Sequence, residues 1–569
     1  MSTFINLPKH NRILCIIVAC RLSLLGIHAQ DIERQLTLVR PYEPSVSDAQ
    51  KITALPNLRD TFSIKPSFNY SIKSRRIDTR FDVTPITPAR LQPLPQTKLY
   101  HGYIKVGASS IPGVMSEVAF NTLRNKDYAV GALVKYDRAG GKVKLANDEK
   151  EFAGFSDISA KGFGKKFFHN NSILYGELGA SGQTVYNYGY QAIDSIGVKP
   201  SPEFEKADIR KRYIFADANV GLRSSHFKTE EMNYDMKLDY KFSNNKFEEK
   251  IYNEHAINFK TQIDNNMFGG NLNLDVFNRS MDFDTLYNNF AFDLNPWFML
   301  DNDSVRFQVG MRVAAYKQGE GDLQYGIFPK IEFQFTLLKD IFIPFVGIDG
   351  YLSPNTYRNM VIENPFVAPG LAVPISKTKL LIYAGLKGTI TSKLSYYLRG
   401  NFATSENDYF FVNDTTFTRY QNYFTVVADN MNTLNIKGEL YFNPVENVDL
   451  GIKANYFRYE TTNEKYAWHR PNFTLEFKAK YNHRNKIIAN FDIMGIGKRY
   501  AKKFDASDLE NDFYLLNSVV SFHLGAEYRY TKSLSFFLKL NNLTGAHYER
   551  WNFYPSHRFH IMGGFTYSL

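Results

Sequence analysis

From about residue 100 to the C-terminus, the chain alternates apolar and polar residues with a period of two. In residues 232–242, every second residue is Met, Tyr, Leu or Phe, and the residues between them are Asn, Asp and Lys. Residues 473–482 and 520–530 repeat the pattern. Side chains i and i+2 of a strand share a face, so each of these segments has one apolar face and one polar face.

Three features favour a transmembrane barrel over a soluble β-sandwich. The segments are often about ten residues long, which is the length of a tilted strand that crosses a bilayer. About 22 of them follow one another, more than a sandwich holds. Short turns also alternate with long connections, such as residues 185–206, 353–377 and 405–431. We therefore expect an all-β fold, an antiparallel barrel of about 22 strands with the long loops outside the cell and both termini in the periplasm.

Closure of the barrel decides which face of each strand meets lipid. Lipid offers no hydrogen-bond partner, so every backbone group must pair within the sheet and the sheet can have no edge. The apolar face then contacts lipid and the polar face lines the lumen. The residues that we expect inside the lumen include Lys237, Asp239, Glu476, Lys478, Glu527 and Arg529.

Composition agrees with this reading. The mean hydropathy is −0.34, and no stretch after the N-terminus reaches the roughly 18 apolar residues of a spanning helix. Aromatic residues make up 15% of the chain, which suits strands and membrane interfaces. The formal charge is +11, but Lys and Arg are interleaved with Asp and Glu along the chain. We interpret them as a hydrated surface or lumen, not as a nucleic-acid site.

Residues 1–30 resemble an export signal. Lys9, His10 and Arg12 form a basic start, a mostly apolar run follows, and cleavage is expected after Gln30. Both cysteines of the chain, Cys15 and Cys20, lie in this segment, so the mature protein would have no disulfide. The alternative is a lipoprotein signal in which Cys20 is lipidated.

Residues 31–99 differ from the rest of the chain and read as a periplasmic or lumenal arm. They show no sustained period, and proline disfavours both helices and central strands. We expect an extended, largely irregular arm with a short helical piece near residues 46–55. The prolines are Pro41, Pro44, Pro56, Pro66, Pro85, Pro88, Pro93 and Pro95.

The last strand resembles the C-terminal signal that barrel-assembly machinery recognises. The residues that carry this resemblance are Gly564, Phe565, Tyr567 and Leu569. Most such signals end in Phe, so Leu569 departs from the pattern. The alternative is a terminal strand without a signal.

Residues 538–569 also resemble the end of a TonB-dependent receptor barrel. The family commonly shows an Asn-Asn-Leu run, aromatic residues, Tyr-Pro, an Arg and a terminal Gly-x-x-Tyr strand. The matching residues are Asn541, Asn542, Leu543, Tyr548, Trp551, Tyr554, Pro555, Arg558, Gly564 and Tyr567. The resemblance implies transport of a solute across the outer membrane.

The N-terminal arm departs from that family. Its receptors carry a plug domain of well over a hundred residues inside the barrel, whereas this arm is shorter and rich in proline. Asp78, Thr79, Phe81 and Val83 lie in a segment that resembles the peptide that contacts TonB. The alternative is a short strand or a linker, and energised uptake by this chain alone is in question.

No motif points to catalysis, a metal or a cofactor. The twelve histidines are scattered. His557 and His560 are three residues apart on an expected strand, so they point to opposite faces and are a poor metal pair. We therefore expect no enzyme activity, no metal and no cofactor.

Two functions remain. In the first, the barrel transports a solute, and the arm or inward-folded long loops such as residues 405–431 fill the lumen, because an open barrel of this size would leak. In the second, the barrel is a membrane platform that binds a periplasmic or surface lipoprotein. The expected partners are outer-membrane lipid, barrel-assembly machinery and, for one or the other function, TonB or a lipoprotein.

Overall fold

The computed structural model describes residues 99–146, 148–190, 205–225, 231–247, 249–265, 267–282, 284–371, 374–416, 420–504 and 512–569. The chain divides into two compact units, residues 1–92 and 93–569, and every described residue belongs to the second. The predicted export signal, the helical piece near residues 46–55 and the segment with Asp78, Thr79, Phe81 and Val83 lie outside the described residues, as does the arm up to residue 98.

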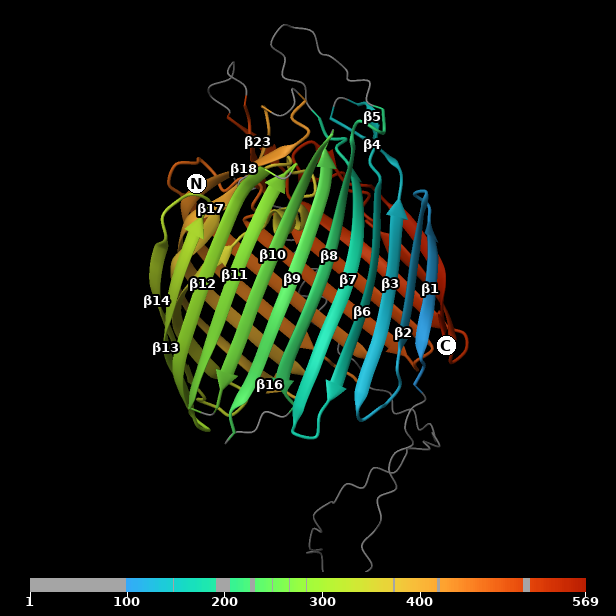
Figure 1. Cartoon of the computed structure of the whole chain (residues 1–569). Coiled ribbons are helices and arrows are strands. Elements are labelled where there is room, and N and C mark those ends of the chain that lie inside the picture. Colours follow the sequence, from blue (N-terminus) through green and yellow to red (C-terminus); the bar gives the residue numbers. More distant parts are fainter. Residues whose placement is uncertain are drawn as a thin grey trace, which may run out of the picture. The chain divides into compact units, whose positions relative to one another are not determined.

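The second unit is a closed antiparallel barrel of 22 strands (Figure 1). Each strand pairs with its neighbour along the barrel, and the first strand pairs with the last. This confirms the predicted fold class. The strands of the barrel are β1 (Gly102–Ser109), β2 (Gly113–Asn121), β3 (Tyr128–Ala139), β6 (Phe155–Phe167), β7 (Ser172–Tyr186), β8 (Arg210–Ser224), β9 (Asn233–Phe247), β10 (Lys250–Asp264), β11 (Phe268–Met281), β12 (Asp284–Asp301), β13 (Val305–Gln318), β14 (Gln324–Phe335), β15 (Ile343–Pro354), β16 (Ile375–Thr391), β17 (Leu394–Asn413), β18 (Phe424–Phe442), β19 (Val448–Thr461), β20 (Phe473–His483), β21 (Ile487–Ile496), β24 (Val519–Arg529), β25 (Leu534–Asn541) and β28 (His560–Ser568).

The barrel closes along the seam between β1 and β28. These strands pair from Tyr103 with Ser568 to Ser109 with Met562. The backbone N–H of Leu569 donates to the carbonyl of Gly102 at 2.8 Å, so the start of β1 and the end of β28 meet at one rim. With this pairing the sheet has no free edge, as a lipid environment requires.

The two faces of the strands differ as the alternating pattern predicts. On β9, Met236, Leu238 and Tyr240 are exposed on the outer face, with Leu238 retaining 45% of its accessible surface. On the inner face of the same strand, Lys237 forms an ion pair with Asp239 at 2.6 Å. The outside of the barrel is therefore a continuous apolar belt. Other exposed side chains of this belt include Val118, Val134, Ile158, Leu178, Val220, Ile257, Val276, Val309, Ile382, Ile436, Val520 and Phe565.

The two rims carry connections of different kinds. One rim, here called the turn rim, holds tight turns such as residues 302–304 and 531–533, together with the start of β1 and the end of β28. The opposite rim, here called the loop rim, holds the long connections that follow β7, β15, β19, β21 and β25. Short strand pairs lie at this rim, as Figure 1 shows for β4, β5 and β23. Their bounds are β4 (Lys142–Lys144) with β5 (Lys150–Phe152), β22 (Arg499–Lys502) with β23 (Phe513–Leu516), and β26 (Glu549–Trp551) with β27 (Tyr554–Pro555).

Among the described residues there is one α-helix, α2 (Tyr357–Glu363), in the connection between β15 and β16. No helix in the described part of the chain is both long and apolar enough to span a bilayer.

Residues 405–431 differ from the expected inward-folded loop. β17 and β18 run through most of this range, and they pair up to Asn413 and Phe424. The two strands are 20 and 19 residues long, well beyond the expected ten. The ladder continues because Phe410, Val412 and Phe424 are buried by other loops at this rim, so the strands gain packing beyond the apolar belt.

Candidate functional site

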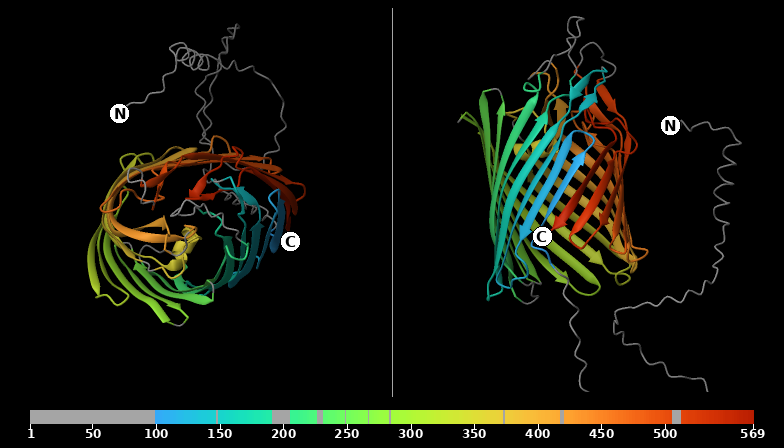
Figure 2. Two further views of the ribbon diagram at one scale, coloured as in Figure 1. Left: turned by 90° about the horizontal axis from the view of Figure 1, so that it is seen from above. Right: turned by 90° about the vertical axis from the view of Figure 1, so that its right-hand side faces the viewer.

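Residues 355–371, between β15 and β16, fold into the barrel and are here called the cap. Figure 2 shows this yellow segment inside the ring of strands when the barrel is seen from above. Tyr357, Met360, Val361 and Val367 of the cap are each no more than 1% exposed. The cap is therefore a packed part of the barrel interior rather than a solvated loop.

The local sequence explains why the cap begins as a helix. The hydroxyl of Thr356 accepts a hydrogen bond from the backbone N–H of Asn359 at 3.1 Å, which is a standard N-cap. Tyr357, Met360 and Val361 follow at helical spacing and form one buried face. The helix ends at Glu363, and the C-cap residue Asn364 precedes Pro365.

Glu254 on β10 holds the start of this helix. Its carboxylate accepts the backbone N–H of Tyr357 at 2.8 Å and that of Arg358 at 3.1 Å. The same carboxylate accepts the hydroxyl of Tyr287 on β12 at 2.7 Å. Glu254 is only 2% exposed, so these three bonds replace the water that a buried carboxylate loses.

Basic side chains strengthen this attachment. Together with Glu254, the side chains of Arg358, Arg279 and Lys211 are here called the latch. Arg358 of the cap forms an ion pair with Asp217 on β8 at 2.7 Å. The guanidinium of Arg279 on β11 lies 3.4 Å from the centre of the Tyr357 ring. The ammonium group of Lys211 on β8 donates to the carbonyl of Val367. Because buried charges are costly without partners, this set ties the cap to the wall formed by β8 to β12.

The far side of the cap packs on other loop-rim elements. Val367 forms a parallel bridge with Phe424 on β18, and the ring of Phe366 stacks on Tyr554 at 3.8 Å between centroids. Trp551 and Phe411 belong to the same apolar cluster. The cap thus connects wall strands, β17 and β18 and the connection after β25 into one core at the loop rim.

His469, in the connection after β19, joins three of these elements. Its Nε2 accepts the backbone N–H of Asn552 at 3.2 Å, so the proton lies on Nδ1, which donates to the carbonyl of Phe411 at 2.8 Å. The imidazole also packs beside Trp551. Burial, with repulsion from Arg499, lowers the pKa of His469 to about 4. Because one ring nitrogen accepts a hydrogen bond and the other donates one, the imidazole of His469 is neutral.

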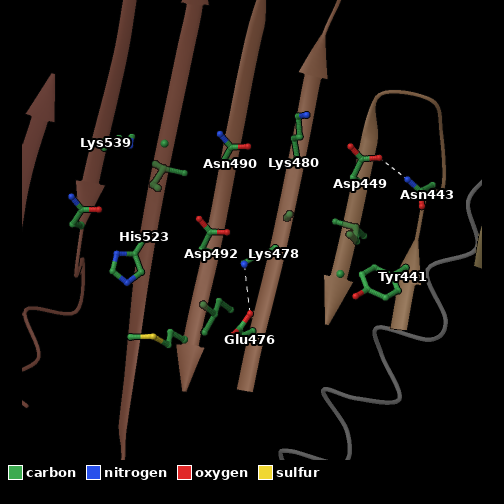
Figure 3. A pocket seen from close by; sticks show the side chains of 18 residues that line it. Tyr441, Asn443, Asp449, Glu476, Lys478, Lys480, Asn490, Asp492, His523 and Lys539 are labelled. Carbon is green, nitrogen blue, oxygen red and sulfur yellow. Dashed lines mark hydrogen bonds and ion pairs between the residues drawn. The ribbon is translucent and has the colours of Figure 1, made fainter. Parts of the chain in front are cut away.

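The inner face of β18 to β25 forms a second wall, which differs from the wall that carries the latch because its polar side chains are exposed. It borders a cavity of about 840 Å³ whose side chains are drawn in Figure 3. Lys478 and Glu476 pair at 3.5 Å, and their side chains keep 70% and 53% exposure. Glu254 and Lys211 on the latch wall, by contrast, are each 2% exposed. One side of the lumen is filled by the cap, and the other side presents free polar groups to water.

This arrangement can hold and pass a polar solute. Carboxylates, lysines and amides line the open wall, including Asp449, Asp492, Lys480, Lys539 and Asn490. Among the described residues, no group of three or more His, Cys, Asp or Glu side chains could hold a metal ion.

The predicted C-terminal residues lie on β28 at the seam. Phe565, Tyr567 and Leu569 are exposed on the outer face. Gly564 faces the lumen, where an added Cβ would lie 2.0 Å from the carbonyl oxygen of Val106 and 2.7 Å from the ring of Phe537. Gly564 therefore serves the close packing of the seam.

Sequence reasoning missed the cap and its latch. The spacing of Tyr357, Met360 and Val361 after Thr356 was the available signal for a short buried helix. Glu254 and Arg279 carry no such signal, because their pattern is that of any lumen-facing pair. The partner of each lies about 80 to 100 residues away along the chain, so only the folded barrel brings them together.

Comparison with solved structures shows that the barrel shares its fold with outer-membrane receptors. The chain matches the pyoverdine outer membrane receptor FpvA from Pseudomonas aeruginosa at 11% identity and a TM-score of 0.62. The match covers 84% of this chain and 79% of FpvA. The ferric-catecholate import receptor Fiu from E. coli matches over 82% of each chain at 10% identity and a TM-score of 0.59. The FrpB iron transporter from Neisseria meningitidis matches over 83% and 82% at 9% identity and a TM-score of 0.62.

No family model and no curated protein sequence matches the chain. The structural matches are TonB-dependent outer-membrane receptors, so the resemblance seen in residues 538–569 is confirmed for the fold. Their low sequence identity carries the comparison no further than the fold.

Replacing Glu254 tests the latch. Glu254→Gln keeps the shape of the side chain but removes the charge, and one amide oxygen cannot accept all three bonds. We expect a loss of roughly 2–4 kcal/mol in the stability of the docked cap. Hydrogen exchange of residues 355–371, followed by mass spectrometry, should accelerate. Glu439→Gln, which removes a lumen-facing carboxylate paired with Lys437 on β18, is the matched control; equal exchange in both variants contradicts the latch.

Acid should loosen the loop-rim core through His469. The folded-state pKa of about 4 lies below the ordinary value of 6.5, so the undocked state takes up a proton first as the pH falls. The docked state is then unaffected above about pH 6.5 and loses up to about 3 kcal/mol by pH 4. Fluorescence of Trp551, which packs beside the imidazole, reports the change. His469→Gln should abolish this pH dependence. If the acid transition is unchanged in that variant, a group other than His469 causes it.

Proposed function

We propose that this chain is an integral outer-membrane barrel that transports a polar solute through its lumen and that the cap is the closed gate of the path. The observation that carries the proposal is the division of the lumen. One wall is latched to the cap, and the other is a free polar surface beside a large cavity. The apolar belt outside and the receptor-type fold support a position in the outer membrane.

The orientation follows from the rims. Outer-membrane barrels place short turns in the periplasm and long loops outside the cell. The cap would then close the path at the extracellular end, and the start of β1 and the end of β28 would lie at the periplasmic end. By their names, the proteins that share the fold are a pyoverdine outer membrane receptor, a ferric-catecholate import receptor and an iron transporter. We propose import here as well, for a solute whose class the next subsection proposes.

Energy coupling is a separate proposal. The segment with Asp78, Thr79, Phe81 and Val83 would reach TonB from the periplasmic end. Deleting residues 78–83 should abolish accumulation of solute without changing the amount of barrel, and unaltered accumulation would contradict it. No contact among the described residues favours the platform function, so transport is the only function that we propose.

Conductance tests the gate. In planar bilayers, the full chain should conduct weakly, because the cap packs with β17, β18 and the connection after β25 into one core across the loop rim. Replacing residues 357–370 by a Gly-Ser linker should raise the conductance severalfold, since the lumen behind the cap is wide and wet. The control replaces residues 142–152, which carry β4 and β5 on the same rim, by a Gly-Ser linker. It shows whether replacing another loop-rim segment also raises the conductance. A capless barrel that stays closed contradicts the gate.

A variant that lacks residues 31–99 separates the two predicted closures of the lumen. If the cap is the gate, this deletion leaves the conductance low. A rise to the level of the capless variant would assign the closure to the arm.

We also propose that barrel-assembly machinery recognises the outer face of β28 at the C-terminus. Phe565, Tyr567 and Leu569 present a lipid-facing row at the last strand. The double substitution Tyr567→Ala with Leu569→Ala should reduce assembled barrel in outer membranes while leaving spontaneous folding into liposomes intact. Ile436→Ala with Leu440→Ala, on the outer face of β18, is the control. Equal losses in both double variants would contradict a specific signal.

A further inference from the structure

We infer that the cavity on the inner wall of β18 to β25 is a binding site for a neutral, hydroxyl-rich solute, of the size and chemistry of a short saccharide. The inference deepens the proposed transport function and rests on it. The site lies beside the path that the cap closes, at about 840 Å³, and Figure 3 shows its side chains projecting from adjacent strands.

Two glycines shape the cavity. Gly451 on β19 and Gly525 on β24 both line it, at positions inside their strands where neighbouring residues carry long side chains. An added Cβ on Gly525 would have nothing closer than Asn490 at 3.8 Å, and one on Gly451 would meet the ring of Tyr441 at 3.4 Å. The glycines therefore leave hollows in the wall that the fold itself does not require, and one hollow lies beside an aromatic ring.

Several polar groups of this wall have no partner. Among the described residues, the side chains of Lys480, Asn490 and Asp492 form neither a hydrogen bond nor an ion pair within the protein. Other lumen-facing charges are paired on their own strand, as Lys437 is with Glu439, Arg529 with Glu527 and, at the cavity itself, Lys478 with Glu476. The cavity therefore offers both paired charges and free side-chain donors and acceptors to a solute.

The charges at the cavity cancel. Its lining holds three carboxylates and three lysines, and the strand register sets unlike charges opposite each other. Lys478 lies opposite Asp492, and Lys480 lies opposite Asp449. A solute with a large net charge gains little from such a wall, because attraction to one sign is offset by repulsion from the other.

A hydroxyl group suits this surface because it donates to a carboxylate and accepts from an ammonium or an amide. Neighbouring strands are roughly 4.8 Å apart and same-face residues roughly 6.7 Å apart. Free donors and acceptors therefore alternate at intervals comparable to the spread of hydroxyls on linked sugar rings. Tyr441 beside the Gly451 hollow offers one flat face for a ring.

Other solute classes fit less well. A multiply charged anion would need an excess of lysine over carboxylate, and the lining has none. A planar aromatic ligand would find two rings in the lining, Tyr441 and the imidazole of His523, and Figure 3 shows them on opposite sides of the cavity, so they cannot stack on one ligand ring together. A zwitterionic peptide could use unlike charges, but it carries them only at its two ends, whereas the charged groups of the lining are spread over β19, β20, β21 and β25.

Calorimetric titration of the full chain tests the site. The protein is kept in a detergent without a sugar headgroup and titrated with maltotriose, triglycine and citrate. We expect saturable binding of maltotriose and no comparable binding of the other two probes. Asp492→Asn removes the charge and replaces one acceptor oxygen by a donor, and Gly525→Leu fills a hollow; each should weaken maltotriose binding about tenfold.

Two control variants match these changes outside the cavity. Asp239→Asn alters a lumen-facing carboxylate on β9, and Gly438→Leu adds the same side chain on the outer face of β18, where an added Cβ meets only Leu398 at 3.9 Å. Both should bind maltotriose as the unaltered chain does. Absent maltotriose binding, equal binding in all four variants, or a preference for triglycine or citrate overturns the inference.

The outcome is separable from that of the transport proposal. Conductance of the capless barrel reports transport and does not need the cavity residues. A conducting capless barrel whose maltotriose binding ignores the cavity variants refutes the saccharide site alone. A cavity that binds maltotriose in a barrel that never opens refutes the gate alone.

Discussion

Backbone hydrogen bonding in a medium without water is the constraint on which the whole structure depends. Each N–H and C=O that meets lipid must find a partner in the sheet, which forces the sheet to close from β1 to β28. Closure gives every strand a lipid side and a lumen side. The period-two pattern, the apolar belt and the polar lumen are all consequences of that single requirement.

Closure also creates the problem that the cap solves. A barrel of 22 strands encloses a wide space, and the lumen wall must be polar because it meets water. The cap fills part of this space by burying an apolar helix face in a core at the loop rim. Its attachment to a polar wall needs charged partners, and Glu254, Arg279 and Lys211 supply them. The lumen is left with a latched side and an open side, and that asymmetry defines the path.

The sequence predicted those parts of the fold that depend on local alternation. Leu238 outside and Asp239 inside follow directly from the period of two, and the number of segments predicted the 22 strands. The residues that dock the cap could not be predicted in the same way. Glu254 reads as an ordinary lumen residue, and its contact with Tyr357 arises from barrel curvature and a loop fold that local sequence does not encode. The extension of β17 and β18 was missed for the same reason, since it depends on packing by other loops.

The central claim is that the two faces of each strand meet lipid and water. Spin labels placed one at a time at residues 234–242 of β9, in the chain reconstituted into lipid vesicles, test it most directly. Accessibility to oxygen should peak at the even positions, which include Leu238, and accessibility to a water-soluble nickel chelate should peak at the odd positions, which include Asp239. Equal access of the nickel chelate to both sets, or no alternation along the strand, would contradict a membrane-spanning barrel.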